Sequence, residues 1–329
     1  MNRIANRSII ILICTLTFTN CKHYTNSNNG NKSVQHLVDS AEYNRKMILL
    51  SNNDKNHLWP PKTPFPLAGA ILPFKRIIAF YGNLYDNHLG ILGELPKTKL
   101  IQKLRDEAQK WKAADTTTPV VIAFHCIAVM AWDEPNEDGK YRDRISFMQI
   151  DTLLQWTKEL NGLVFLDIQV GTSTLQEEIP PLESYLIKEN IHLGIDPEFS
   201  MKNGPLHEGQ IGSFNAHDIN YAIDYLAEIV KKYHLPPKIL VVHRFTADMV
   251  VDYDKIKKVP EVQVIMDMDG FGSKAGKKDS YNYFIYQEPV EFTGFKLFYK
   301  NDVENDGTGL MTPKEILNLI PKPIYIQYQ

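Results

Sequence analysis

The sequence contains little cysteine and little net charge. It has three cysteines among 329 residues, and two of them, Cys14 and Cys21, fall within or beside an N-terminal apolar segment. Once that segment is set aside as a targeting signal, Cys126 has no partner for an internal bridge, which excludes a disulfide framework. Stability must then come from a core, which a chain of this length can build. The formal net charge of -3 lacks the basic excess of nucleic-acid-binding proteins, so no nucleic acid is expected as a partner.

The apolar run nearest the N-terminus is too short to span a bilayer. It extends from Ile9 to Phe18, follows two arginines and precedes Cys21, which is the layout of a signal peptide. A cysteine directly after such a run resembles the bacterial lipoprotein signal, in which Cys21 becomes the lipidated first residue. This interpretation predicts an exported protein, held at a periplasmic or cell-surface membrane by its lipid. An ordinary signal peptide cleaved nearby, or an uncleaved anchor, is the alternative.

From about residue 75 onwards, strand-like apolar runs alternate with helix-like runs. The strand-like runs are almost continuously Val, Ile, Leu and Phe, as expected for strands covered on both faces. Between them, apolar residues recur at helical spacing, as at Ile219, Ile223, Leu226 and Val230. The predicted strands are residues 76–82, 119–128, 162–170, 191–199, 238–245, 262–270, 293–300 and 323–329.

Eight strands alternating with helices over about 250 residues predict a (β/α)8 barrel of the TIM type, with the chain ending on strand eight. A doubly wound open sheet is the alternative, but no glycine-rich phosphate-binding motif follows the first strand. No helix follows the last strand, and residues 34–51, which are weakly helical, could occupy its place. The predicted organisation is a signal peptide at 1–20, the lipidated cysteine with a polar tether and lead-in helix at 21–60, and the barrel at 61–329.

Polar side chains stand near the C-terminal ends of these strands, where the chemistry of this fold is located. Residues two apart on a strand point to the same face, so Asp196 and Glu198 can face the barrel mouth together, as can Asp267 and Asp269. A single acid at a strand end is more often a helix N-cap, but burial of several carboxylates is costly unless they face a polar cleft or are used. The strand-end set is His125, Asp167, Gln169, Asp196, Glu198, His243, Arg244, Asp267, Asp269 and Gln327.

Two kinds of chemistry fit this set. Glycoside hydrolysis needs a carboxylic acid that protonates the leaving oxygen and a second group that acts as base or nucleophile. A neighbouring Asp196 could help to keep Glu198 protonated at neutral pH. Metal-assisted hydrolysis is the alternative, but the sequence lacks the His-x-His pair common in such barrels, so no metal or other cofactor is expected. The metal ligands in that alternative would be His125, Asp167, His243 and Asp267 or Asp269.

The loop at residues 131–144 is long and acidic and carries Trp132. Aromatic side chains beside acids suit sugar rings, whose CH faces stack on them, so Trp132 is a candidate substrate-binding residue. The alternative is that the loop is simply solvated and mobile.

At these residues the sequence resembles known glycosidases. "GIDPEF" (194–199) is similar to the strand-four Asp-x-Glu motif of family 18 (chitinase-like) and family 25 (muramidase-like) glycoside hydrolases, and "VIMDMDGFG" (264–272) resembles the strand-six motif of family 18. The resemblance implies that Glu198 is the general acid, that Asp196 is its partner and that Asp269 holds the sugar or intermediate. The family 18 pattern has a further Asp where this chain has Gly194. A longer stretch, from "IIAFYGN" to "EGQIGS", resembles uncharacterised secreted bacterial lipoproteins with a barrel fold.

These features together predict an envelope-anchored barrel that acts on a glycan or cell-envelope polymer. Glu198 is the predicted general acid, assisted by Asp196, Asp167 and Asp269. Two alternatives remain, a metal-dependent phosphoester or amide hydrolase and a barrel that binds a glycan or partner without catalysis. The predicted substrate-binding residues are His125, Gln169, His243, Arg244, Asp267, Trp132 and Gln327.

Overall fold

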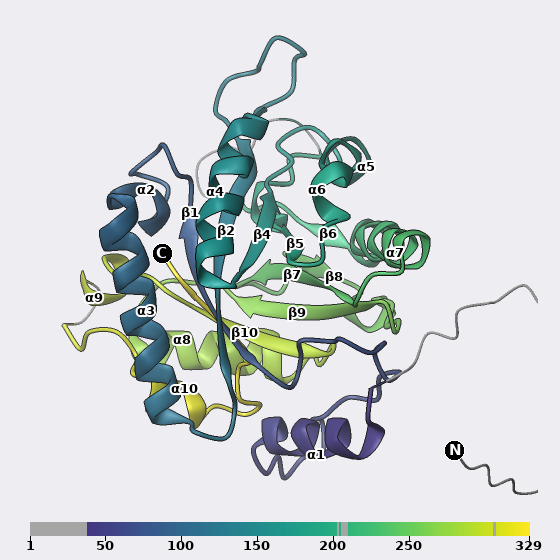
Figure 1. Ribbon diagram of the computed structural model, residues 1–329, viewed down its shortest axis with the longest axis vertical. Helices are drawn as coiled ribbons and strands as arrows, with labels where there is room; N and C mark the ends of the chain where they lie inside the picture. The colour runs from purple at the N-terminus through teal and green to yellow at the C-terminus, as the bar shows by residue number, and fades with distance from the viewer. Residues whose placement is uncertain (1–37, 203, 205–209, 305–306) are drawn as a thin grey trace, which may run out of the picture. The chain divides into compact units, whose positions relative to one another are not determined.

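The computed structural model describes residues 38–202, 204, 210–304 and 307–329 (Figure 1). The predicted signal peptide, Cys21 and the polar tether lie outside the described residues, so lipid attachment and export stay predictions. Within the described ranges, no helix combines the length and the apolar character needed to cross a membrane.

Eight parallel strands close into a barrel, which confirms the predicted fold class. Their order around the barrel is β1-β2-β4-β5-β7-β9-β10-β11, and β11 pairs with β1 to complete the circle. Each predicted strand is present, but β5 ends at Ile195 instead of residue 199, β9 ends at Met268 instead of residue 270 and β10 ends at Leu297 instead of residue 300. The barrel strands are β1 (Arg76–Gly82), β2 (Val120–Ala131), β4 (Leu163–Ile168), β5 (Ile191–Ile195), β7 (Lys238–Arg244), β9 (Val262–Met268), β10 (Phe292–Leu297) and β11 (Tyr325–Tyr328).

Each strand alternates between the barrel interior and an outer face covered by helices. In β4, Leu163 and Phe165 belong to the interior cluster, whereas Val164 and Leu166 belong to the outer one. Because both faces are apolar, the strands appear in the sequence as nearly continuous hydrophobic runs.

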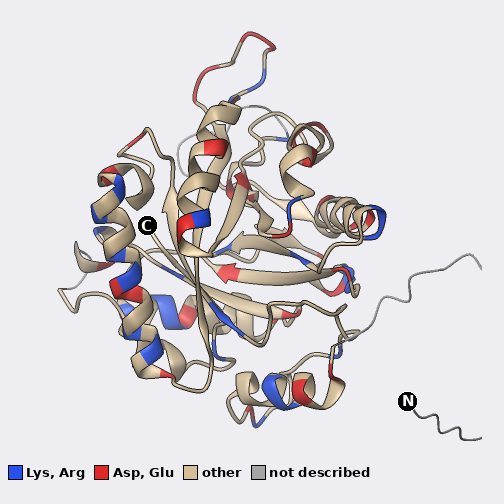
Figure 2. Ribbon diagram, in the orientation of Figure 1, with Lys and Arg blue, Asp and Glu red and all other residues tan. Residues whose placement is uncertain are grey.

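Four longer helices cover the outside of the barrel. They are α3 (Lys97–Ala114) on β1 and β2, α4 (Phe147–Leu160) on β2 and β4, α7 (Ala216–Tyr233) on β7 and β9, and α8 (Lys274–Tyr281) on β9. The predicted apolar face of α7 is completely buried, and burial of each such side chain stabilises the fold by about 1.5–3 kcal/mol relative to its exposure. Most charged residues lie on the outer helices and loops (Figure 2).

Shorter elements complete the connections. They are α2 (Ile91–Glu94), β3 (Arg142–Arg144), α5 (Leu175–Glu178), η1 (Pro180–Leu182), α6 (Glu183–Leu186), η2 (Pro197–Phe199), β6 (Phe214–Asn215), β8 (Val250–Val251), η3 (Tyr253–Lys255), η4 (Asn282–Tyr286), α9 (Asn301–Glu304) and α10 (Pro313–Leu317).

The N-terminal helix α1 (Ser40–Ser51) covers the N-terminal end of the barrel (Figure 1). Its Tyr43 and Met47 are buried in the interior cluster with Phe165. The expectation that this segment replaces the missing eighth outer helix is therefore wrong. The outer face of β11 is instead covered by α3, whose Trp111 indole N–H donates to the Tyr328 hydroxyl at 2.9 Å. The Tyr299 ring also stacks on Tyr328, with ring centroids 5.3 Å apart.

The long loop after β2 folds back as a hairpin, in which β3 pairs antiparallel with the end of β2. Glu178 of α5 is fully buried and anchors it, with its carboxylate 2.8 Å from Arg142 Nε and 2.6 Å from Arg144 Nε. A buried carboxylate is tolerated when it is paired in this way. The ion pairs fix the base of the loop that carries Trp132.

Candidate active site

Near the C-terminal end of the barrel, a polar side chain stands on the inward face of each strand or, for β5, directly after the strand. Farther down the same faces most side chains are apolar, as with Ile77 and Ala79 of β1 below Tyr81, although His192 of β5 and Gln263 of β9 are buried and polar. All these polar side chains are buried, so they form a layer between the apolar core and the barrel mouth. The layer consists of Tyr81, His125, Asp167, Asp196, His243, Asp267, Lys296 and Gln327.

Two glycines make room for this layer. A Cβ at Gly194 would lie 2.3 Å from both Asp167 Oδ1 and His125 Nε2, and a Cβ at Gly294 would lie 2.3 Å from Asp267 Oδ1. The strand register sets Gly194 directly beside Asp167. Gly194 stands where the chitinase-like pattern has a further Asp. The packing explains the glycine, because the Asp167 carboxylate and the His125 imidazole occupy the space that a side chain would need.

A cavity of about 650 Å³ opens above the polar layer. Asp196, Glu198 and Asp269 line it together with Gln169 and Lys296. Its size and its mixture of aromatic walls with a few convergent polar groups are typical of a small-molecule site. The aromatic lining residues are Tyr81, Trp132, Phe199, Phe245, Phe271, Phe298 and Tyr299.

Asp196 and Glu198 reach the cavity through a turn rather than by strand alternation. Strand β5 ends at Ile195, and the 3-10 turn η2 begins at Pro197. The Asp196 carboxylate caps this turn and accepts the Glu198 N–H at 3.0 Å. Asp196 is thus an N-cap as well as a cavity residue, and its capping bond fixes the backbone from which the Glu198 side chain projects.

Both of these carboxyl groups favour the protonated form. Burial raises the pKa of Asp196 well above its ordinary value. Burial and then the charge of Asp269 raise the pKa of Glu198 to about 7. Glu198 can therefore carry a proton into a reaction near neutral pH.

Asp269 is the ionised carboxylate of the cavity. Its Oδ1 lies 2.9 Å from Lys296 Nζ, and its Oδ2 lies 3.0 Å from His243 Nδ1. Burial acts to raise the pKa of Asp269, but Lys296 and His243 outweigh it and hold the pKa below its ordinary value. One cavity thus holds two carboxyl groups, Glu198 and Asp269, whose pKa values are shifted in opposite directions.

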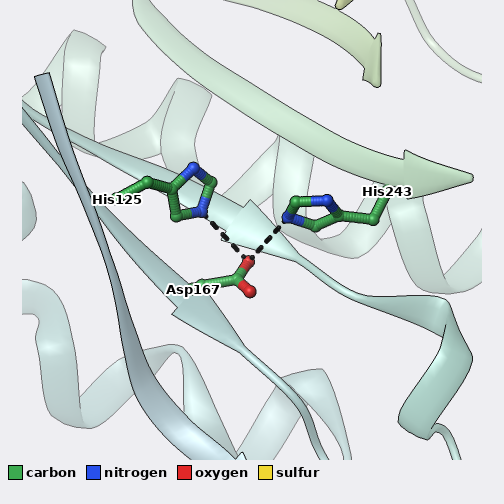
Figure 3. A group of neighbouring side chains, drawn as sticks. All are labelled: His125, Asp167 and His243. Carbon is green, nitrogen blue, oxygen red and sulfur yellow. Dashed lines mark ion pairs between the residues drawn. The ribbon is translucent and has the colours of Figure 1, made fainter. Parts of the chain in front are cut away.

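Beneath the cavity, side chains from β2, β4 and β7 converge (Figure 3). Asp167 Oδ1 lies 3.3 Å from His125 Nε2 and 3.4 Å from His243 Nε2, and the Tyr81 hydroxyl donates to Asp167 Oδ2 at 2.8 Å. Burial acts to raise the pKa of Asp167, but the two imidazoles outweigh it and hold the pKa well below its usual range. His125, Asp167 and His243 are fully buried and do not line the cavity.

The same three side chains meet the spacing of a metal site, since their ligand atoms all lie within 4.8 Å of one another. A catalytic metal needs a coordination position that is open to the substrate. His125, Asp167 and His243 are fully buried, and their atoms His125 Nε2, Asp167 Oδ1 and His243 Nε2 have no hydrogen-bond partner within the described part of the chain. The three side chains could therefore hold a metal ion, and the metal-dependent alternative stays open beside chemistry by the cavity carboxyl groups.

The other predicted substrate-binding residues divide into two groups. Gln169 and Trp132 line the cavity. Gln327 and Asp267 lie in the buried layer, where Gln327 donates to the Tyr325 hydroxyl at 2.8 Å and burial raises the pKa of Asp267 to about 8.

Arg244 does not line the cavity. Its guanidinium donates to the carbonyl oxygens of Thr246, Ala247 and Phe284 and pairs with Glu288 at 2.5 Å. The structure therefore places Arg244 as a clamp for the loops that follow β7 and α8.

Sequence reasoning missed Tyr81 and Lys296. Lys296 Nζ pairs with Asp269 and lies 3.9 Å from the centroid of the Tyr81 ring. A signal was present, because Lys296 interrupts an otherwise apolar strand and shares the face of Gly294. A lysine is almost never fully buried without a partner, so its position inside a predicted core strand indicated a carboxylate across the barrel.

The closed sheet and the lined cavity at its C-terminal end define the class of this protein as a TIM-type barrel with a candidate active site. No protein-family model and no curated protein matches the sequence. Among solved structures, two Bacillus subtilis mannanases are similar. The first is 12% identical over 78% of this chain and 79% of its own, with a TM-score of 0.40. The second is 13% identical over 77% of this chain and 79% of its own, with a TM-score of 0.38. An isomaltulose synthase from Klebsiella is similar at 10% identity, 80% of this chain, 66% of the other and a TM-score of 0.36. Likeness at this level carries no argument about activity.

Proposed function

We propose that this protein is a glycoside hydrolase in which Glu198 is the general acid and Asp269 is the ionised carboxylate. The observation that carries the proposal is that these two carboxyl groups line one cavity with their pKa values shifted apart, Glu198 to about 7 and Asp269 below its ordinary value. Glycosidic cleavage needs one protonated and one ionised carboxyl group around the scissile bond.

In the proposed reaction, Glu198 donates its proton to the leaving oxygen as the bond from that oxygen to the anomeric carbon breaks. Asp269 acts on the anomeric carbon, either directly as nucleophile or as the base that takes a proton from the attacking water. The water supplies the hydroxyl that ends on the sugar in both cases. If Asp269 is the nucleophile, the ionised Glu198 takes the proton of the water that breaks the glycosyl–enzyme bond and is restored; if Asp269 is the base, Asp269 takes that proton, and proton exchange with solvent then returns Glu198 to the acid and Asp269 to the carboxylate. Lys296 and the capped turn at Asp196 hold the two reacting groups in place.

The lining of the cavity supports a neutral glycan as substrate. Trp132 follows β2 and Phe271 follows β9, which stand on opposite sides of the barrel in the strand order. The lysines of the cavity already have acidic partners, Lys296 with Asp269 and Lys300 with Glu94. Stacking surfaces on opposite sides, with each described lysine of the cavity already paired to an acid, fit an uncharged chain of more than one sugar.

We also propose that the enzyme works at the cell envelope, anchored by lipid on Cys21. The support is the arginine-flanked apolar segment that ends at this cysteine. Metabolic labelling with a fatty acid tests it, with Cys21→Ser as the comparison. If the Cys21→Ser chain takes up as much label as the wild type, the anchor lies elsewhere.

The activity is tested by release of reducing ends from a panel of neutral envelope polysaccharides. Glu198→Gln is expected to lower kcat by about 10²–10⁴-fold, the usual worth of a general acid. Glu291→Gln is the matched control, because Glu291 is a buried carboxyl group outside the cavity that accepts the Val264 N–H. Unchanged cleavage by Glu198→Gln would show that another group is the acid.

Two further outcomes contradict the proposal in different ways. Stoichiometric zinc or manganese in the purified active protein, with activity lost on chelation, would favour the metal-dependent hydrolase. Binding of a glycan without any hydrolysis would favour a non-catalytic receptor.

A further inference from the structure

Three buried side chains of the polar layer each direct one unpaired atom toward the same small space. The atoms are His125 Nε2, Asp167 Oδ1 and His243 Nε2, and none of them has a hydrogen-bond partner within the described part of the chain. All three side chains are fully buried. Figure 3 shows the two rings on either side of the Asp167 carboxylate, each with its Nε2 toward the same oxygen. Unpaired polar atoms are costly in a protein interior, so three of them at one place indicate a missing ligand that accepts electron pairs.

We propose that His125 Nε2, Asp167 Oδ1 and His243 Nε2 bind one divalent metal ion of the zinc class, with a water molecule as its fourth ligand. The ion would connect three strands of the barrel, β2, β4 and β7. The sequence predicted no metal because it lacks a His-x-His pair, but here each ligand comes from a different strand. The site does not depend on the proposed function.

The distances between the three atoms match the edges of a tetrahedral site. Asp167 Oδ1 lies 3.3 Å from His125 Nε2 and 3.4 Å from His243 Nε2, and all three atoms lie within 4.8 Å of one another. Tetrahedral ligands at the usual zinc bond lengths stand about 3.3–3.5 Å apart, whereas ligands at right angles around an octahedral ion stand about 3 Å apart. Hydrogen bonds from ring N–H groups to the carboxylate would be shorter, at about 2.7–3.2 Å.

Gly194 of β5 leaves room for an ion at this place. Strand β5 lies between β4 and β7 in the barrel. A Cβ at Gly194 would lie 2.3 Å from both Asp167 Oδ1 and His125 Nε2, which is close to the zinc–ligand bond length of about 2.0–2.2 Å. The space that the glycine leaves open is therefore one from which an ion can contact both atoms.

Further side chains stand beside the other polar atoms of Asp167 and His243. The Tyr81 hydroxyl donates to Asp167 Oδ2 at 2.8 Å, which leaves Oδ1 for the ion. A ring that binds a metal through Nε2 carries its proton on Nδ1, and His243 Nδ1 lies 3.0 Å from Asp269 Oδ2. Carboxylates and hydroxyl groups in such outer positions orient metal ligands.

His125 has outer neighbours of the same kind. Its Nδ1 lies 2.6 Å from the Tyr325 hydroxyl oxygen, which can accept the ring proton. The Gln327 side-chain amide lies 3.0 Å from the same nitrogen, and its oxygen has no hydrogen-bond partner among the described residues. A half-turn of that amide lets its oxygen accept the proton as well.

The donor set determines the kind of ion. Two imidazoles and one carboxylate suit zinc and related transition metals, whereas Mg²⁺ and Ca²⁺ prefer oxygen ligands. Asp267 and Asp269 do not join the set, because they face the other nitrogen of His243, with carboxylate oxygens 3.6 and 3.0 Å from Nδ1. The ligands are thus His125, Asp167 and His243.

The first test uses zinc alone and the full wild-type chain. The protein is freed of metal with a chelator, equilibrated with a buffered excess of zinc and assayed for bound metal by atomic emission. About one zinc ion per chain is expected, and X-ray absorption at the zinc edge is expected to show four nitrogen or oxygen ligands at about 2.0–2.1 Å, two of them imidazole. Absence of tightly bound zinc would overturn the proposal, as would a bound ion with six ligands or without imidazole.

The second test removes single ligand atoms. His125→Asn and His243→Asn are each expected to lower zinc affinity by more than about 100-fold, whereas Tyr81→Phe, which removes only an outer partner, is expected to lower it by about 10-fold. His192→Asn is the matched control, because His192 is a fully buried strand histidine outside the ligand set and Asn keeps an acceptor for the Ile239 N–H. Equal zinc affinity of His243→Asn and His192→Asn would overturn the proposal.

Gly194→Ala keeps all three ligands and fills the space between them. Zinc is expected to raise the urea midpoint of the wild type, because it binds the folded state, and to leave the midpoint of Gly194→Ala unchanged. Gly276→Ala, which changes an open position in α8, is expected to respond as the wild type does. A Gly194→Ala chain that binds zinc with wild-type affinity would overturn the location of the site.

Zinc binding and glycan cleavage are measured separately, so their failures are distinguishable. If zinc binds as described and no glycan is cleaved, the proposed function fails and the metal site stands. If glycans are cleaved by a protein that binds no zinc, the metal site fails and the proposed function stands.

Discussion

Carboxyl groups of the same chemical kind differ in this cavity because of their surroundings. Glu198 is enclosed with the charge of Asp269 nearby, whereas Asp269 itself faces Lys296 and His243. The sequence places both at strand ends but does not say which one retains a proton. That distinction depends on Lys296, which comes from a strand far along the chain.

The first prediction at this scale is the pH dependence of the wild-type reaction. Glu198 must be protonated, and its pKa of about 7 means that activity falls as the pH rises through about 7. Asp269 must be ionised, and because its pKa is lowered, activity is lost on the acidic side only below about pH 4, the ordinary value for an Asp. The expected profile of kcat/KM is a bell with an acidic optimum. An alkaline optimum would contradict the roles given to the two groups.

A second prediction concerns Gly194. A methyl group there would meet Asp167 Oδ1 and His125 Nε2 at 2.3 Å, so Gly194→Ala is expected to lower the free energy of unfolding by about 1–3 kcal/mol, the usual cost of overpacking. Gly276→Ala is the matched control, because Gly276 lies in α8 with only Ser273 Oγ nearby, at 3.4 Å. In a helix, Ala is favoured over Gly, so this variant should be neutral or stabilising. Equal urea midpoints for both variants would contradict the tight fit at Gly194.

At the scale of the element, the strands were predictable and their surroundings less so. Continuous apolar runs indicate strands covered on both sides wherever they lie, because that pattern depends only on burial. The place of α1 was not predictable, since a weakly amphipathic helix fits the floor of a barrel as well as its wall. The turn at Pro197 was missed for a related reason, because an Asp-Pro pair directly after a strand is compatible with either an extended chain or a capped turn.

The candidate site was predictable to a similar extent. Strand order alone brings Asp196, Glu198 and Asp269 to the mouth, and all three line the cavity. It does not distinguish the residues that line the cavity from those one layer below, such as Asp167 and His243. Residues of the two layers are only two positions apart on the same face of a strand. Which of them reaches the cavity depends on how neighbouring strands are aligned, and the sequence does not give that alignment.

The hairpin after β2 leads to a third prediction. Trp132 is 51% exposed on the cavity rim, and Glu178 anchors the base of its loop through Arg142 and Arg144. Trp132→Ala is expected to raise KM for a polymeric substrate by about 10-fold, about 1.4 kcal/mol, with kcat little changed. Steady-state kinetics on a long and a short oligosaccharide measure it. A loss confined to kcat would place Trp132 in the reaction step instead of in substrate binding.

At the scale of the whole molecule, the buried carboxyl groups affect stability. Burial raises the pKa of Glu291 to about 8 and that of Asp267 to about 8, whereas unfolded chains release these protons near about pH 4. The folded state therefore binds more protons than the unfolded state between these values. The contribution of these two groups to the free energy of unfolding is complete below about pH 4, and it is lost as the pH rises through about 8.

The fourth prediction follows from this linkage. Glu291→Gln keeps an acceptor for the Val264 N–H but cannot ionise. The variant is expected to gain stability relative to the wild type as the pH is raised from about 6 to about 9. Urea unfolding at both values measures the difference. A stability difference between variant and wild type that does not change with pH would show that Glu291 is already ionised in the folded protein.

Helix α1 determines which way the molecule would face if it is held by its N-terminus. The described chain starts at the floor of the barrel, and the cavity opens at the opposite end. Under the proposed lipid anchor, the point of attachment lies upstream of the floor, on the side away from the open end. Under the proposed function, substrate would then be selected by its height above the membrane as well as by its chemistry, and variants with a longer or shorter segment before α1 would differ in the envelope layer that they reach.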